Sequence, residues 1–221
     1  MNIFDIVGPV MVGPSSSHTA GAVKIGLACR KLLAQDLKSV DIGLHGSFLA
    51  TGRGHGTDKA IVAGLLGFEV DDSRIPDSFE IAKEKGIKVS FSAIDLGEGA
   101  HPNSAKLHLV GKNDKELVVV ASSLGGGRIL INQLDGLDAN FSGDYPTLIV
   151  HNLDQPGHVA EVTSMLQKEN INIATMQLYR ARRGGNAVMV IECDSEVSQE
   201  AITWLERLDG IVKVTYYSLE D

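Results

Sequence analysis

The stretch Asn152-Leu153-Asp154-Gln155-Pro156-Gly157 decides the fold of the C-terminal part of the chain. Asn, Asp, Pro and Gly favour a tight turn, and Pro is well tolerated in the first turn of a helix. The apolar run at 147–151 before it predicts a strand, and Val159, Val162 and Leu166 after it share one helical face. The stretch therefore connects a strand to a helix.

Four further elements extend this unit. Alternating apolar residues predict strands over 174–178, 187–193 and 212–216. A helical repeat of apolar residues over 201–208 lies between the last two strands. The resulting order, βαββαβ, is the ferredoxin-like arrangement.

The N-terminal part is a second unit, and its pattern predicts the α+β class. Helices are expected after residue 19 with Ser17 or a neighbour as N-cap, after residue 56 with Thr57 or Asp58 as N-cap, and over 78–85. The glycine-rich stretch 46–56 predicts a loop. Alternation predicts strands, mostly antiparallel and late in the unit, over 40–44, 87–91, 105–109, 117–121 and 128–132.

The boundary between the two units is predicted from composition. Residues 135–144 are rich in Asp, Gly, Asn and Ser, which favour turns and loops. We expect a first domain over 1–138, a linker over 139–145 and a second domain over 146–221.

Hydroxyl side chains and an imidazole crowd together in the segment Gly13-Pro14-Ser15-Ser16-Ser17-His18-Thr19. The segment precedes a predicted helix, and helix N-termini bind anions through unpaired N–H groups. An elaborate N-cap is the simpler alternative, but a cap uses one hydroxyl. A Ser–His nucleophile pair is disfavoured because sequence neighbours rarely face each other and no orienting carboxylate can be assigned. We predict a pocket for a small carboxylate or phosphate.

Other places along the first unit offer polar side chains or glycines in predicted loops and turns. Arginine forks onto carboxylates, and glycine lets the backbone approach a ligand closely. A plain surface loop or turn is the alternative reading at each place. The candidates are Arg53 and His55, His101 and Asn103, and Ser123 with Gly125 and Gly126.

Composition limits the class of protein. Of 221 residues, 43% are hydrophobic and 22% are charged, which is ordinary for a globular protein. The net charge of −8 and the lack of a basic stretch argue against nucleic acid or an anionic membrane as partner. Cys29 and Cys193 are far apart, so a disulfide framework is not expected. Without a signal peptide or a long apolar run, we expect a cytoplasmic protein.

Several motifs together give a specific resemblance. The segment 13–19, His101-Pro102-Asn103 and Ser123-Leu124-Gly125-Gly126-Gly127, in this order, resemble the beta chain of bacterial iron–sulfur-dependent L-serine dehydratases. The C-terminal unit resembles an ACT domain, marked by 152–157 and Asn170-Ile171-Asn172-Ile173. The first unit is also similar to the allosteric substrate-binding domain of some phosphoglycerate dehydrogenases.

The resemblance implies a lyase that converts L-serine to pyruvate and ammonia, a reaction that feeds gluconeogenesis. It implies a 4Fe-4S cluster rather than pyridoxal phosphate, with the cluster cysteines on a larger alpha chain. The sequence agrees independently, because cluster ligation commonly needs three or four thiolates and this chain has two cysteines. We expect no metal ligands on this chain, no activity of the chain alone, and a heterodimer or a larger assembly with the alpha chain.

The resemblance also suggests roles for the candidate residues. Ser15, Ser16, Ser17, His18 and Thr19 are expected to face the alpha chain and to bind or process serine, with the loop candidates above as further substrate contacts. An effector, most plausibly serine, is expected on the ACT unit at Asn152, Asp154, Gln155, Pro156, Gly157, Asn172 and Ile173. The alternatives are an ACT unit that only forms a homodimer, and a chain that is purely a regulatory amino-acid-binding module. A transcription regulator is disfavoured by the acidic charge.

Overall fold

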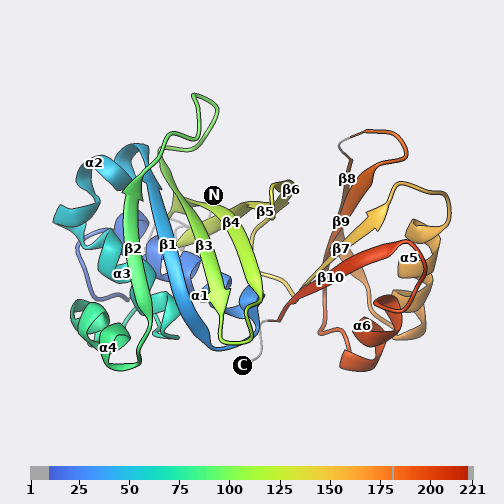
Figure 1. The fold of residues 1–221 in the computed structure, drawn as a ribbon, viewed down its shortest axis with the longest axis horizontal. Helices are drawn as coiled ribbons and strands as arrows, with labels where there is room; N and C mark the ends of the chain where they lie inside the picture. The colour runs from blue at the N-terminus through green and yellow to red at the C-terminus, as the bar shows by residue number, and fades with distance from the viewer. Residues whose placement is uncertain (1–9, 181, 219–221) are drawn as a thin grey trace. The chain divides into compact units, whose positions relative to one another are not determined.

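The chain folds into two compact units, Met1–Gly136 and Leu137–Asp221, in a computed structural model (Figure 1). The structure describes residues 10–180 and 182–218. No helix within these ranges is both long and apolar enough to cross a membrane.

The N-terminal unit is a sheet with helices packed on one face (Figure 1). Within the described residues, its strands pair in the order β2-β1-β3-β4-β5. The elements are η2 (Ser16–Ala20), α1 (Gly21–Leu33), β1 (Leu37–His45), α2 (Gly46–His55), α3 (Thr57–Leu65), η3 (Ile75–Asp77), α4 (Ser78–Glu84), β2 (Lys88–Ala93), β3 (Asn103–Gly111), β4 (Glu116–Gly125) and β5 (Arg128–Leu134).

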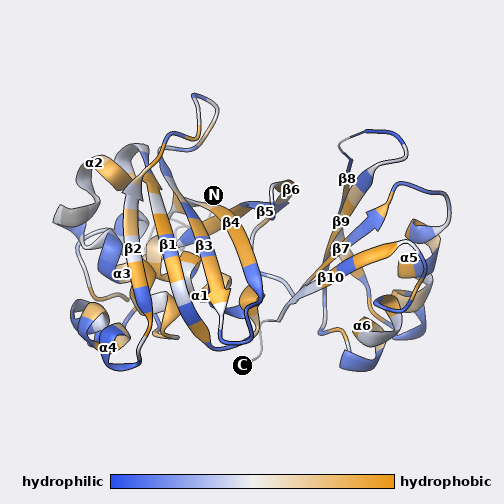
Figure 2. Ribbon diagram, in the orientation of Figure 1, coloured by the Kyte–Doolittle hydropathy of each residue, from blue (hydrophilic) through white to orange (hydrophobic). Residues whose placement is uncertain are grey.

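The core of this unit lies between α1 and the middle of the sheet. Ile25 and Leu32 on α1 are buried together with Leu107 on β3 and Val119 on β4. Figure 2 shows apolar and polar bands alternating along β1, β2 and β3. This alternation buries one face of the sheet and leaves the other open.

Two glycines let α1 and α3 cross at close range. A Cβ on Gly64 would lie 2.0 Å from the Val23 carbonyl oxygen, and one on Gly26 would lie 2.2 Å from the Ile61 carbonyl oxygen. Because α1 also carries the core residues, this crossing fixes where the N-terminal turn η2 sits relative to α2 and α3.

The pairing of β1 with β2 differs from the predicted antiparallel pattern. These strands are parallel, with Val40 opposite Val89, whereas β1, β3, β4 and β5 pair antiparallel. A parallel pair needs a crossover connection, and α2, α3 and α4 supply it.

The predicted loop at 46–56 is wrong, because α2 occupies it. Gly46 adopts a φ of +55°, and the Ser47 N–H donates to the Pro102 carbonyl at 2.7 Å. Phe48 on the next position is fully buried. Burial of this ring and the anchoring of the first turn compensate for the low helix propensity of the glycines.

The predicted N-caps also need correction. The first helical turn begins earlier than expected, with Ser15 as the N-cap of η2. Gly56, with a φ of +70°, precedes α3, and neither neighbour caps it. The Thr57 hydroxyl is buried without a partner among the described residues, and Asp58 accepts the Lys59 N–H.

The segment predicted as a linker over 139–145 begins inside strand β6 (Leu137–Phe141), which opens the second unit. In β6, Ala139 and Phe141 are buried, whereas Asp138 is exposed. Burial thus alternates with a period of two residues, as in a strand. Asp135 and Gly136 come before this strand, and Gly143 and Asp144 come after it, so only part of the polar stretch lies in the strand.

The C-terminal unit confirms the predicted βαββαβ order. Its elements are β7 (Thr147–Leu153), α5 (His158–Lys168), β8 (Ile173–Arg180), β9 (Asn186–Cys193), α6 (Gln199–Leu205) and β10 (Ile211–Tyr217). The described strands pair antiparallel in the order β10-β7-β9-β8. Val162, Leu166 and Leu205 pack with Val150 and Ile191, so both helices share one core.

Candidate active site

A polar cluster forms around His18 at the start of the first helical segment. Turn η2 is a π-helix in which the Gly21 N–H donates to the Ser16 carbonyl. The Ser15 Oγ accepts the His18 N–H at 3.1 Å. Single π-helical turns recur at functional sites.

Two glycines allow this turn to pack closely. Gly13 has a φ of +133°, and a Cβ there would lie 2.5 Å from the Thr19 side chain. A Cβ on Gly21 would lie 2.0 Å from the Ser123 Oγ. A side chain at either position would displace the turn and therefore His18.

Hydroxyl groups surround both ring nitrogens of His18. Its Nε2 lies 3.0 Å from the Ser47 Oγ and 3.1 Å from the Thr51 Oγ1. Its Nδ1 lies 3.3 Å from the Ser17 Oγ. The edge of the ring packs against Phe48, with ring centres 5.4 Å apart. Hydrogen bonds and packing thus hold the imidazole in one orientation.

A second imidazole lies beside the first. The ring centre of His55 is 5.0 Å from that of His18, and the His55 carbonyl accepts the Thr19 hydroxyl at 3.2 Å. Burial lowers the pKa of His18, and the positive charge of His55 lowers it further, while a hydrogen bond with the Ser47 backbone acts in the opposite direction. His18 is therefore a neutral base at pH 7.

Replacing His55 with Gln is expected to raise the pKa of His18, because a neighbouring positive charge is removed. Burial still disfavours the charged ring, so the pKa of His18 stays below its ordinary value. An NMR titration of the His18 ring in the full chain measures the shift. His108→Gln is the matched control, since His108 pairs with Glu116 on the open face of the sheet. An unchanged or lower pKa of His18 in His55→Gln contradicts the coupling.

One face of α2 carries the hydroxyls that sequence reasoning missed. Ser47, Thr51 and His55 are four residues apart, so they line up along one side of a helix. The spacing was readable from the sequence, but the glycines between them favoured a loop. Arg53 also lies in α2, and its side chain falls outside the described part of the structure.

The candidates His101 and Asn103 lie beside the start of α2. Asn103 forms a bridge with Gly46, and the Asn103 N–H donates to the His101 Nδ1 at 3.1 Å. Pro102 between them accepts the Ser47 N–H. This loop supports α2, and its side chains are not among the groups that bond to His18.

The candidates on β4 separate into two environments. Ser123 is fully buried against Gly21, and its hydroxyl has no hydrogen-bond partner among the described residues. Gly125 and Gly126 have φ values of +88° and +62°, and they form the turn to β5. Ser123 therefore adjoins the His18 turn, whereas the glycines serve the hairpin.

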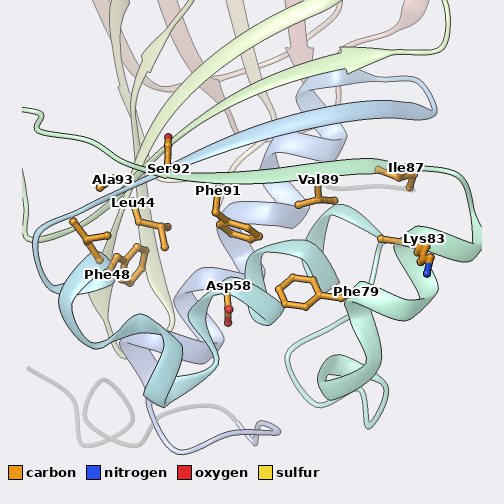
Figure 3. Close-up of a pocket in the computed structure, with 12 residues that line it drawn as sticks. Leu44, Phe48, Asp58, Phe79, Lys83, Ile87, Val89, Phe91, Ser92 and Ala93 are labelled. Carbon is orange, nitrogen blue, oxygen red and sulfur yellow. The ribbon is translucent and has the colours of Figure 1, made fainter.

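A cavity of about 760 Å³, lined mostly by apolar side chains, borders α2 (Figure 3). Phe48, Phe79 and Phe91 line it, together with aliphatic side chains from β1 and β2. Phe48 is shared, because it contacts His18 as well as the cavity. Among the described residues, none of the site residues predicted from the sequence lines this cavity.

The effector candidates of the C-terminal unit fall into two groups. The Asn152 Oδ1 is buried and has no partner among the described residues. Asp154 accepts the Gly184 N–H at 2.9 Å and Arg180 at 3.0 Å, and these bonds lower its pKa. Gln155, Pro156 and Gly157 complete the turn, with Gly157 as the N-cap position of α5.

The second group lies at the other end of the same sheet. Ile173 pairs with Cys193, whereas the end of β7 pairs with the start of β9. The Asn172 Nδ2 donates to Asp194 at 2.7 Å. One chain therefore does not bring Asn172 and Ile173 to the 152–157 turn.

Comparison with known proteins identifies the family. A sequence model of the serine dehydratase beta chain matches residues 2–133, and one of the ACT domain matches residues 146–210. The chain belongs to the serine dehydratase beta chain family. The predicted resemblance and the ACT fold are thereby confirmed.

Curated relatives agree with this family. The chain is 40% identical to the probable L-serine dehydratase beta chain of Bacillus subtilis, over 97% of this chain and 96% of the relative. It is 39% identical to the L-serine dehydratase beta chain of Peptoniphilus asaccharolyticus, over 92% and 93%. A D-3-phosphoglycerate dehydrogenase of Archaeoglobus fulgidus is 28% identical over 98% of this chain but 39% of its own length. As a serine dehydratase beta chain, the protein is a subunit of an L-serine dehydratase.

The donor groups of this beta chain do not fit an iron–sulfur cluster of its own. Cys29 and Cys193 are both buried, in different units. Burial raises the pKa of the Cys29 thiol strongly and that of Cys193 to about 11, so neither is a ready thiolate ligand. In residues 10–180 and 182–218, His, Cys, Asp and Glu side chains form no group of three that could hold a metal ion.

Proposed function

We propose that the His18 cluster is the beta chain's share of an active site that converts L-serine to pyruvate and ammonia. The observation that carries the proposal is a neutral imidazole ringed by the hydroxyls of Ser17, Ser47 and Thr51 at a helical N-terminus. We take L-serine as the substrate because the chain belongs to the serine dehydratase beta chain family. An alpha chain with a 4Fe-4S cluster completes the site, and no pyridoxal phosphate is needed.

The residues of this chain suit two tasks. The hydroxyl of Ser16 and the N–H groups of the turn are donors for the serine carboxylate. The neutral imidazole of His18 can accept the proton that leaves the α-carbon. The cluster on the alpha chain supplies a Lewis acid for the substrate hydroxyl. Loss of the α-proton and of water leaves an enamine, which hydrolyses to pyruvate and ammonia.

Co-expression with a cluster-bearing alpha chain tests this assignment. Under anaerobic conditions, we expect pyruvate formation from L-serine only when both chains are present, with the iron on the alpha chain. Iron content and pyruvate are measured on the complex and on each chain alone. Full turnover by the alpha chain alone contradicts the proposal.

The alternative is a regulatory module that contributes no active-site residue. The similarity to a D-3-phosphoglycerate dehydrogenase over nearly the whole chain favours this reading, because that enzyme catalyses a different reaction. In this case, changes in the His18 cluster alter the response to serine and leave the maximal turnover of the complex unchanged.

We also propose that the turn 152–157 binds L-serine as an effector, and that a homodimer formed through the ACT unit brings in Asn172 and Ile173. Asp154 is ionised at pH 7 because its pKa is lowered, so it can pair with an ammonium group. The buried Oδ1 of Asn152, which has no hydrogen-bond partner within residues 10–180 and 182–218, offers a second acceptor.

Asp154→Asn is expected to weaken L-serine binding about tenfold or more, since a hydrogen bond to a charged group contributes about 1.5–3 kcal/mol. Calorimetry on the full chain measures the affinity, and the sedimentation of each variant reports its dimer. Asp114→Asn is the control, because Asp114 forms an exposed ion pair with Lys38 in the other unit. Equal affinity in Asp154→Asn excludes Asp154 from the effector site, whereas no binding to an intact dimer leaves the ACT unit a dimerisation element only.

A further inference from the structure

The hydroxyl of Thr51 has one proton, and its neighbours determine where that proton goes. Thr51 Oγ1 donates to the Ser47 carbonyl of the preceding helical turn at 2.9 Å. A carbonyl can only accept, so this bond uses the single hydroxyl proton. Toward the His18 Nε2, at 3.1 Å, Thr51 can therefore act only as an acceptor.

The ring nitrogen that faces Thr51 must then carry a proton. A neutral imidazole has one N–H, so a protonated Nε2 leaves Nδ1 with a lone pair. The Ser47 Oγ, 3.0 Å from Nε2, is compatible with this assignment because a hydroxyl can donate or accept.

The groups near Nδ1 are also compatible with a lone pair on that nitrogen. The Ser17 Oγ lies 3.3 Å from Nδ1 and can donate to it. The Ser15 Oγ accepts the His18 N–H and lies 3.3 Å from the Ser17 Oγ, so the Ser15 proton is available to Ser17. Ser15 can thus donate to Ser17, Ser17 to the His18 Nδ1, and the His18 Nε2–H to Thr51. No group in this chain has to donate more protons than it carries.

We propose that Thr51 is a positioning residue that holds His18 as the Nε2–H tautomer and directs the Nδ1 lone pair toward Ser17. Nδ1 is then the atom of this ring that accepts a proton during turnover. The inference about turnover rests on the proposed function, whereas the tautomer itself does not.

Two substitutions of Thr51 distinguish the effect of its hydroxyl group from the effect of its branched shape. Thr51→Val keeps the branched side chain but removes the fixed acceptor, so Nε2 can instead accept from the Ser47 hydroxyl and the other tautomer becomes populated. Thr51→Ser keeps the hydroxyl and restores the preference. Thr203→Val is the matched control, because Thr203 makes the same bond to the carbonyl four residues earlier, at Gln199, in α6.

Nitrogen NMR of the imidazole rings in the full chain, above the pKa of His18, measures the tautomer directly. His18→Gln identifies the signals. We expect an unprotonated Nδ1 and a protonated Nε2 in the native chain, in Thr51→Ser and in Thr203→Val, and averaged signals in Thr51→Val. A protonated Nδ1 in the native chain, or native signals in Thr51→Val, overturns the proposal.

Kinetics of the complex with the alpha chain supply the second readout. Thr51→Val is expected to lower kcat about 10-fold to 100-fold with little change in KM, since a misplaced proton impairs acid–base catalysis, and Thr51→Ser is expected to restore kcat. Suppose that Thr51→Val shows averaged NMR signals but a native kcat, and that His18→Gln also turns over normally. This combination refutes the proposed function but leaves the tautomer assignment intact. A native kcat in Thr51→Val with an inactive His18→Gln refutes the positioning role.

Discussion

Replacement of His18 by Gln is expected to lower kcat of the alpha–beta complex by about 10²–10⁴-fold, the usual contribution of general acid–base catalysis. Gln matches the size and hydrogen-bonding capacity of the ring but accepts no proton at neutral pH. The side chain lies in the turn before α1 and outside the buried core, so the fold is expected to persist. Anaerobic pyruvate formation measures the effect at equal iron content.

The control for this prediction is His108→Gln, which removes an imidazole from β3 that pairs with Glu116. Its kcat is expected to match the native complex. Ser16→Ala combined with His18→Gln is expected to raise KM as well, because a carboxylate donor is lost. Native kcat in His18→Gln, with the complex intact, argues for the regulatory alternative.

The second large effect concerns folding and not catalysis. Gly64→Ala is expected to lower the free energy of unfolding by about 1–3 kcal/mol or more, because its Cβ would lie 2.0 Å from the Val23 carbonyl and overpacked cores cost this much. The atom in the way belongs to the backbone of α1, so no side-chain rotation relieves the clash. Urea unfolding, followed through helical signal, measures the loss.

Gly99→Ala is the matched control for Gly64→Ala. A Cβ on Gly99 would meet no heavy atom within 4 Å among the described residues. Its midpoint in urea is expected to match the native chain. A native midpoint in Gly64→Ala means that α1 and α3 can separate freely, which contradicts the close crossing that positions η2.

The C-terminal fold was predictable because its signals are local. Alternating residues such as Met189 and Ile191, and the helical spacing of Val162 and Leu166, bury one face each, so pattern and packing agree. The parallel pairing of β1 and β2 was not predictable, since it depends on a crossover of three helices and leaves no short-range mark in the sequence.

The polar cluster was predictable in part. The crowded hydroxyls at 15–19 indicated a ligand site, and the structure gathers that segment into one turn. Ser47 and Thr51 were missed because Gly46, Gly52 and Gly54 favour a loop. The burial of Phe48 and its contacts across the unit, which no local pattern encodes, fold this segment into α2.

A competition measurement tests most directly whether this chain supplies part of the active site. The alpha chain is saturated with native beta chain, and increasing His18→Gln beta chain is added while pyruvate formation is followed. If His18 lies in the shared site, turnover is expected to fall in proportion to the fraction of variant in the complex, toward the low rate of the variant alone. Turnover that stays at the native level while the variant replaces native chain in the complex contradicts the account.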